Sequence, residues 1–342
     1  MLALFQIMSL GDNAGAGPLF PLPHTVSGVS SGASIAANQL MAYSEVVRGA
    51  AFIAGSPYGC GNAAAVPNSW SCSYNKPPLD LQSLYAYAAA RATAGQIDAL
   101  SHLVGKPLYL YSGTKDTIVF QAEMDRTAAY FSRYVGAANI EYVAGVPSEH
   151  GYITDGYGEC CGCLNGSFIL NCEYDQAGAV LRKVLGGSAL EPRAPTAPAA
   201  QLVEVSQYNY RPKARAWGSV QMSDNAFVYV PSACAASLGG CRVHVNYHGC
   251  RGGKMSNIGP LHYGYNEWAE SNQIVVVYPQ ATNGTGNPHG CWDWTGVTGS
   301  NFDSKTSSQL VTVLSLINDL EQAIAAGPTN STDSALPTGT RA

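Results

Sequence analysis

A pentapeptide near the start of the chain, Gly28-Val29-Ser30-Ser31-Gly32, has the pattern G-x-S-x-G. A serine hydroxyl is a weak nucleophile until a base takes its proton and an acid orients that base. Small residues beside the serine allow a sharp strand-to-helix turn that exposes its Oγ. Ser30 is therefore a candidate nucleophile. The pentapeptide alone is weak evidence in a chain with 37 glycines, because a plain turn of small residues looks the same.

An acid and a histidine follow the serine, each after a later predicted strand. Asp116 follows "LYLYSG", and His150 follows "IEYVAG". Nucleophile, acid and histidine come in this chain order in α/β-hydrolases. We therefore predict a triad of Ser30, Asp116 and His150. Two rival acids stay open: Asp125, which lies inside a predicted helix, and Asp155, which lies in the histidine loop.

The other histidines and the cysteine-rich motif give no metal site. His244 and His248 lie on one face of one predicted strand, about 13 Å apart, too far to share an ion. Cys160, Cys161 and Cys163 in "ECCGC" lack a partnered ligand pair, so disulfides are the better interpretation. The remaining histidines are interpreted as structural or surface residues: His24, His102, His262 and His289.

The parts expected to supply the second oxyanion donor come late in the chain. An α/β-hydrolase takes this N–H from a loop after an early strand, often marked by His-Gly. Here "RVHVNYHGC" occupies residues 242–250 and ends in His-Gly-Cys. A predicted helix, the strand "IVVVYPQ" and "GCWDW" (290–294) follow it. These pieces normally precede the nucleophile. The simplest account is a hydrolase domain whose chain is circularly permuted.

Cys250 and Cys291 have two interpretations. A free Cys250 thiol could act as the nucleophile, but no acid and base are better placed for it than for Ser30. A disulfide to Cys291 would close a long loop and contribute about 4 kcal/mol by chain entropy. We predict the disulfide. Trp292 and Trp294 beside it are either core residues or the wall of a substrate cleft.

The rest of the chain alternates strand and helix signals, which predicts a parallel sheet with helices on both faces. A stretch rich in Pro, Ala and Gly at about 187–200 is predicted to be a linker. We expect a single catalytic domain over 24–327. The segment 1–23 is interpreted as a signal-peptide remnant, a cloning-derived start or a misassigned start codon, and 328–342 as a disordered tail. Helices are expected at about 32–44, 82–100, 121–135, 175–186, 262–272 and 304–326.

Composition limits the function classes. The 342 residues are 46% hydrophobic and only 12% charged, with a net charge of −5. This gives no reason to expect nucleic acid or an anionic membrane as a partner. No apolar run reaches the roughly 18 residues that span a bilayer. Ten cysteines, several at short spacings, are typical of an oxidised, secreted protein. No motif indicates a cofactor, and we expect a monomer.

The ordered set of motifs resembles a known family. "GVSSGASIAANQLMAYSEV", "YLYSGTKDT", "CRVHVNYHGC", "GYNEWAESNQIVVVYPQA" and "GCWDWTG" are similar to single-domain, fungal-type extracellular poly(3-hydroxybutyrate) depolymerases. The resemblance covers roughly residues 24–325. It implies a secreted, circularly permuted α/β-hydrolase that cuts an insoluble aliphatic polyester through a Ser/His/Asp triad.

Carried over residue by residue, the resemblance adds the backbone N–H groups of Ser31 and Cys250 as oxyanion donors. It places Trp292 in the substrate crevice, and we add Trp294 and His248 there. Three alternatives stay open: a feruloyl, acetylxylan or aromatic polyester esterase, a non-catalytic binding protein, and a thiol enzyme using Cys250. The disulfides that the resemblance implies are Cys60–Cys72, Cys161–Cys172, Cys234–Cys241 and Cys250–Cys291, and the spacing allows Cys160–Cys163 as a fifth.

Overall fold

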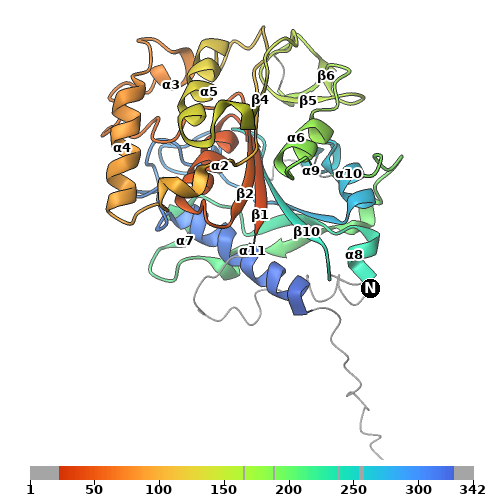
Figure 1. The fold of residues 1–342 in the computed structure, drawn as a ribbon. Helices are drawn as coiled ribbons and strands as arrows, with labels where there is room; N and C mark the ends of the chain where they lie inside the picture. The colour runs from red at the N-terminus through yellow and green to blue at the C-terminus, as the bar shows by residue number, and fades with distance from the viewer. Residues whose placement is uncertain (1–22, 165, 188, 237–238, 254–257, 327–342) are drawn as a thin grey trace, which may run out of the picture.

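A computed structural model describes residues 23–164, 166–187, 189–236, 239–253 and 258–326 (Figure 1). The predicted N-terminal segment 1–23, apart from Pro23, and the predicted tail 328–342 lie outside these residues. The described part is built around an eight-stranded sheet, with a smaller three-stranded sheet packed near one end of it.

The order of strands in the large sheet is β4-β3-β2-β1-β10-β11-β9-β8. The pairs from β4 to β11 are parallel, and β9 and β8 complete the sheet in antiparallel pairing. The first strand therefore lies in the middle, between the strand that follows it and one that comes some 200 residues later. The strand that leads into "YHGC" thus pairs directly with the strand that leads into Ser30. The strands of this sheet are β1 (His24–Val29), β2 (Val47–Ile53), β3 (Leu108–Tyr111), β4 (Ile140–Val143), β8 (Leu202–Ser206), β9 (Asn225–Tyr229), β10 (Arg242–Tyr247) and β11 (Ile274–Tyr278).

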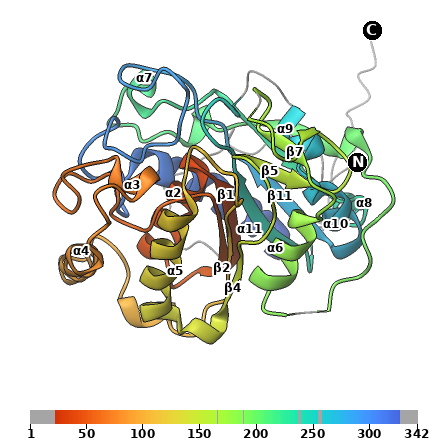
Figure 2. The ribbon, with the colours of Figure 1, turned by 90° about the horizontal axis from the view of Figure 1, so that it is seen from above.

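Helices cover both faces of the sheet. Figure 2 shows α2 and α5 on one side and α6 and α10 on the other. The central strands are consequently buried on both faces, and every residue of β1 and β11 is buried. The helices are α2 (Ser31–Ala42), α3 (Ser71–Tyr74), α4 (Leu81–Thr93), α5 (Gln121–Val135), α6 (Gln176–Val184), α7 (Trp217–Val220), α8 (Ser232–Ala236), α9 (Ile258–His262), α10 (Tyr265–Asn272) and α11 (Ser308–Ala326).

Short elements complete the chain, and most of them were not expected from the sequence. The three-stranded sheet, in the order β5-β7-β6, is formed by strands of two or three residues, too short to show a hydrophobic period. These elements are β5 (Tyr152–Thr154), β6 (Glu159–Cys160) and β7 (Ile169–Asn171), and the 3₁₀ helices η1 (Leu100–Leu103), η2 (Ala137–Asn139), η3 (Ala199–Gln201) and η4 (Tyr208–Tyr210).

Two expected segments differ in detail. The helix predicted over 262–272 begins only at Tyr265, as α10, because Gly264 adopts a left-handed φ of 85° that separates it from α9. The predicted linker 187–200 contains no helix or strand in its described residues before η3. It is held along α10, because Glu191 N–H donates to Asn272 Oδ1 at 2.8 Å and Ala194 N–H to the Glu267 carbonyl at 3.1 Å.

Five disulfides join the ten cysteines: Cys60–Cys72, Cys160–Cys163, Cys161–Cys172, Cys234–Cys241 and Cys250–Cys291. Two of them, Cys160–Cys163 and Cys161–Cys172, lie in the small sheet and its loop. Among the described helices, none combines the length and the apolar composition that crossing a bilayer requires.

Candidate active site

The turn between β1 and α2 holds Ser30 in a strained conformation. Its φ of 58° is unusual for a residue with a side chain, and its ψ is −124°. The two glycines of the motif, Gly28 and Gly32, have no room for a side chain. A Cβ on Gly28 would lie 2.2 Å from the Gly32 carbonyl oxygen, and one on Gly32 would lie 2.3 Å from that of Tyr247. The G-x-S-x-G pattern is therefore explained by the close contact of β1, α2 and β10.

Asp116 and His150 form a buried hydrogen-bonded pair. The Asp116 Oδ2 and the His150 Nδ1 lie 2.8 Å apart, and 8% and 4% of the two residues' surfaces are exposed. The other carboxylate oxygen of Asp116 accepts from the N–H groups of Ile118 and Val119, at 2.9 and 2.8 Å. These two bonds fix the carboxylate, so the imidazole keeps a set orientation with its Nε2 available for a substrate-side proton.

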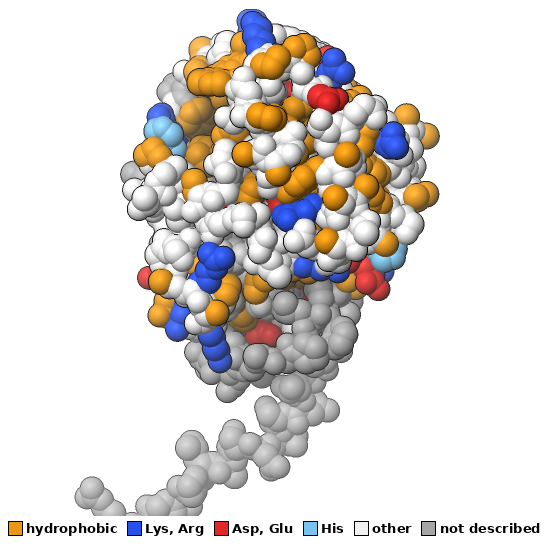
Figure 3. Space-filling view, turned by 90° about the vertical axis from the view of Figure 1, so that its left-hand side faces the viewer, with side chains coloured by type: hydrophobic (Ala, Val, Ile, Leu, Met, Phe, Trp, Pro, Cys, Tyr) orange, Lys and Arg blue, Asp and Glu red, His pale blue; other side chains and the backbone are white. Residues whose placement is uncertain are grey.

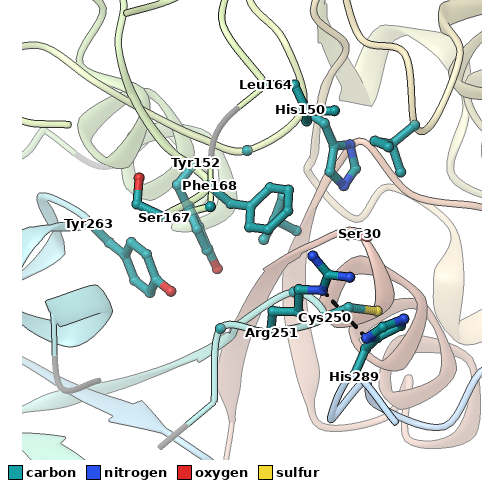
Figure 4. Close-up of a pocket in the computed structure, with 16 residues that line it drawn as sticks. Ser30, His150, Tyr152, Leu164, Ser167, Phe168, Cys250, Arg251, Tyr263 and His289 are labelled. Carbon is teal, nitrogen blue, oxygen red and sulfur yellow. Dashed lines mark hydrogen bonds between the residues drawn. The ribbon is translucent and has the colours of Figure 1, made fainter. Parts of the chain in front are cut away.

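Ser30 and His150 line the same cavity, of about 470 Å³. In Figure 4 the His150 ring points toward Ser30. The walls are mainly apolar and aromatic, and include Leu164, Phe168 and Tyr263. A water-accessible serine and an oriented histidine thus meet at a hollow that an apolar chain could enter.

Ser31 and Cys250, whose backbone N–H groups are the expected oxyanion donors, line a small recess together with Ser30. Ser31 begins α2, so its N–H has no acceptor within the helix. Within the described residues, neither this group nor the Cys250 N–H donates to protein. Gly249 packs against the elbow, the turn of residues 28–32 that joins β1 to α2, so closely that a Cβ there would lie 3.3 Å from Ser30 Cβ. Two N–H groups without a protein acceptor thus belong to residues at the Ser30 recess, and an oxyanion site requires such donors.

The loop that contains Cys291 and Trp292 links the Cys250 turn, residues 248–252, to the elbow. The Cys250–Cys291 disulfide ties this turn to the following loop, and the Trp292 N–H donates to Ser31 Oγ at 3.3 Å. His248 Nε2 accepts from the Ala281 N–H at 3.0 Å, and its Nδ1 lies 2.6 Å from the Gly249 carbonyl. His248 is thus protonated on Nδ1 and fixes the backbone that leads into Cys250. Burial lowers its pKa to about 4, which keeps the ring neutral.

Comparison with known proteins identifies relatives of this chain. No family model matches the chain. A poly(3-hydroxybutyrate) depolymerase of Delftia acidovorans is 32% identical over 92% of this chain, which spans 63% of that protein. A polyhydroxybutyrate depolymerase of Talaromyces funiculosus is also 32% identical, over 86% of this chain and 88% of its own length. The chain belongs to the polyhydroxybutyrate depolymerase family.

Solved structures of the family agree with this assignment. The crystal structure of the Penicillium funiculosum PHB depolymerase superimposes with a TM-score of 0.79 at 30% identity, over 89% of this chain and 96% of that one. A serine-to-alanine variant of a PHB depolymerase, complexed with R3HB trimer, superimposes with a TM-score of 0.78 at 30% identity. The predicted family and the mostly parallel α/β fold are thus confirmed.

Two of the three residues expected in the substrate crevice line neither the main cavity nor the smaller recess at Ser30. Trp292 is fully buried and packs edge-on against Tyr247, and His248 is 2% exposed. Neither lines the 470 Å³ cavity. Sequence order places Trp292 near the Cys250 turn, but only tertiary packing decides which side of that turn it occupies. Trp294 does reach the site, because it lines a smaller recess of about 130 Å³ that also includes Ser30.

The rival acids do not reach Ser30 or His150 in this structure. Asp125 is exposed on α5 and accepts from the Tyr142 hydroxyl at 2.9 Å, and Asp155 pairs with Arg193 at 2.8 Å. The disulfide of Cys250 removes its thiol as a nucleophile. His244 is buried, with its two ring nitrogens bonded to Thr25 and Ser27, and burial lowers its pKa to about 3.

Sequence reasoning missed several residues at the site. Glu149 is one of them: its carboxylate accepts from the Thr117 hydroxyl at 2.8 Å and from the His150 N–H at 2.9 Å, joining the acid loop to the histidine loop. Nothing in its residue type or spacing could have revealed this. His289, interpreted as structural or surface, lines the cavity together with residues that lie in predicted loops: Leu164, Phe168 and Arg251.

Proposed function

We propose that this chain is a serine esterase that hydrolyses the ester bonds of poly(3-hydroxybutyrate). The observation that carries this is the His150–Asp116 pair, at 2.8 Å, which faces the same cavity as Ser30. The names of its relatives supply the substrate, because members of the family act on this polymer.

The reaction follows from the positions of these side chains. His150 takes the Ser30 proton as Oγ attacks an ester carbonyl, and the N–H groups of Ser31 and Cys250 stabilise the oxyanion. The carbon–oxygen bond then breaks, and His150 returns the proton to the departing alcohol. Water, activated by the same histidine, releases the acid from Ser30. Asp116 keeps the imidazole oriented and stabilises it while it is charged.

The surface suits an insoluble, uncharged substrate. Leu164 at the cavity is 49% exposed, and Trp70, stacked on Tyr74 at the end of α3, is 63% exposed. On the face that carries α3 and α4, hydrophobic side chains are interleaved with uncharged groups and with separate Lys, Arg, Asp and Glu side chains (Figure 3). Five disulfides favour an oxidising compartment, so we place the enzyme outside the cell. Adsorption would then use the catalytic domain's own surface.

Parallel assays on four substrates test the proposal. The enzyme is incubated with a poly(3-hydroxybutyrate) suspension, methyl ferulate, acetylated xylan and an aromatic polyester film. We expect clearing of the suspension and release of soluble 3-hydroxybutyrate oligomers, at rates well above those on the other three. Release of ferulate or acetate with no clearing of the suspension would contradict the polyester assignment while keeping the esterase chemistry.

A further inference from the structure

The cavity beside Ser30 contains one unbalanced charge. Among its described lining residues, Arg251 is the one lysine or arginine, and there is no aspartate or glutamate. An apolar polyester needs no cation at this position. Arg251 directly follows Cys250, so its guanidinium extends from the same turn that presents the oxyanion N–H.

The backbone of Arg251 adopts a conformation that favours glycine. Its φ is 66°, in a turn closed by the Gly252 N–H, which donates to the Gly249 carbonyl at 3.0 Å. A side chain other than glycine or asparagine is strained there, and such strain concentrates at functional sites. An arginine at this position is therefore not explained by the turn itself.

His289 holds Arg251 in place at two points. The Arg251 N–H donates to the His289 carbonyl at 2.7 Å, and Arg251 Nε lies 3.4 Å from His289 Nδ1. Figure 4 shows the guanidinium extending into the cavity between Phe168 and Ser30, with its Nε edge toward His289. The ends of the guanidinium that carry two N–H groups each thus remain directed at the cavity.

No carboxylate among the described residues neutralises this guanidinium, and its one polar side-chain contact is His289. Arg251 and His289 also line a second cavity, of about 360 Å³, so the pair forms the wall between two hollows. A planar guanidinium with its outer N–H groups directed at a cavity is suited to bind a carboxylate in two parallel hydrogen bonds.

We propose that Arg251, positioned by His289, binds the free carboxylate of acidic ester oligomers. This inference rests on the proposed polyester hydrolysis. In a chain of hydroxy acids the free carboxylate belongs to the fragment that leaves as the alcohol when Ser30 attacks the preceding carbonyl. Anchoring that fragment would favour cleavage near the carboxyl end. The ester bond breaks, the leaving alcohol oxygen takes the proton from His150, and the fragment departs with its carboxylate unchanged.

Two substrates of equal length isolate the carboxylate. The kcat/KM is measured for the linear 3-hydroxybutyrate trimer as its free acid and as its methyl ester, with wild type and with R251Q. We expect wild type to prefer the acid by about tenfold, the selectivity range of one charged hydrogen-bonded contact. R251Q should lower the acid-to-ester ratio to near one. The control is R133Q, which removes an exposed arginine of α5 that lies over the Tyr85 ring of α4. It should keep the wild-type ratio.

Further variants separate loss of the anchor from loss of the turn. R251N keeps a residue that tolerates left-handed φ, so it should fold like wild type and lose the preference. R251K keeps the positive charge but not the planar guanidinium that can form two parallel hydrogen bonds. It should retain part of the preference for the acid, and that preference should fall more steeply as the salt concentration rises. A ratio unchanged in both R251Q and R251N would overturn the carboxylate site. If wild type cleaves short p-nitrophenyl esters but neither trimer, the polyester function itself fails, and this inference fails with it.

Discussion

At the scale of single residues, the site depends on the hydrogen bonds that fix the Asp116 carboxylate and the His150 ring. One carboxylate oxygen of Asp116 accepts hydrogen bonds from two backbone N–H groups, and the other lies within hydrogen-bonding distance of His150 Nδ1. The sequence predicts an acid at this position, because a hydrolase acid follows a strand, and the structure brings it within 2.8 Å of His150 Nδ1. Glu149, which joins Thr117 to the His150 backbone, could not be predicted, because its role depends on two loops that meet only in the folded chain.

The orienting role of Asp116 can be tested by a change that keeps its shape. Asp116→Asn favours the wrong imidazole tautomer and removes the charge that stabilises the imidazolium. We expect kcat on p-nitrophenyl butyrate to fall by about 10³-fold or more. Asp125→Asn, on α5 at the Tyr142 hydroxyl, is the matched control and should stay within twofold. Equal losses in both variants would reject Asp116 as the specific partner of His150.

A buried carboxyl group links stability to pH. Glu123 on α5 is fully buried, neither oxygen has a hydrogen-bond partner, and burial raises its pKa to about 9. Because the unfolded chain loses this proton near pH 4.5 and the fold retains it, stability is lost as pH rises from about 4.5 toward 9. Glu123→Gln should therefore raise Tm relative to wild type at pH 8 and much less at pH 4. A difference that is constant with pH, or as large in exposed Glu141→Gln, would reject this account.

At the scale of elements, close contact of backbones determines the elbow. Long, strongly patterned segments such as α5 and α11 were predicted within a few residues, because their periodicity is local information. The small sheet that brings Phe168 and Leu164 to the cavity was not predicted, because its strands have two or three residues and two disulfides fix its loop. The same limit explains Trp292, whose place in the core is decided by Tyr247 and His248.

Substitution of one elbow glycine tests the close contact. In Gly32→Ala the new methyl group would lie 2.3 Å from the Tyr247 carbonyl oxygen and 2.4 Å from that of His248. Relief requires moving β10 away from α2, at a cost of about 3 kcal/mol, which should lower Tm by roughly 5 °C. Gly145→Ala is the control, since its Cβ meets nothing within 4 Å. Calorimetry that finds the two variants equally stable would contradict the contact.

At the scale of the whole molecule, the permuted chain makes one site from segments far apart in sequence. The elbow comes from the first strand, and the Cys250 turn comes from a strand that pairs with it directly. The order of motifs was enough to predict that the late "YHGC" segment lies beside the Ser30 turn, because a hydrolase site needs both. The orientation of the side chains around Cys250 was not predictable, because it depends on contacts among three loops.

The disulfides should differ in their contribution to the whole fold. Cys250–Cys291 closes 41 residues and Cys160–Cys163 only three. Loop-closure entropy gives about 4 kcal/mol for the longer one and roughly half of that for the shorter. Replacing each pair by serines should therefore lower Tm more at 250 and 291, and only that variant should lose esterase activity through a loosened oxyanion turn. The reverse order of Tm values would contradict this account.

The most direct test of the central claim is product release from a poly(3-hydroxybutyrate) film, measured by mass spectrometry for wild type and Ser30→Ala. We predict that wild type releases 3-hydroxybutyrate monomers and short oligomers. The variant should adsorb to the film equally well and release less than about a thousandth as much. Release by Ser30→Ala near the wild-type rate would show that Ser30 is not the nucleophile.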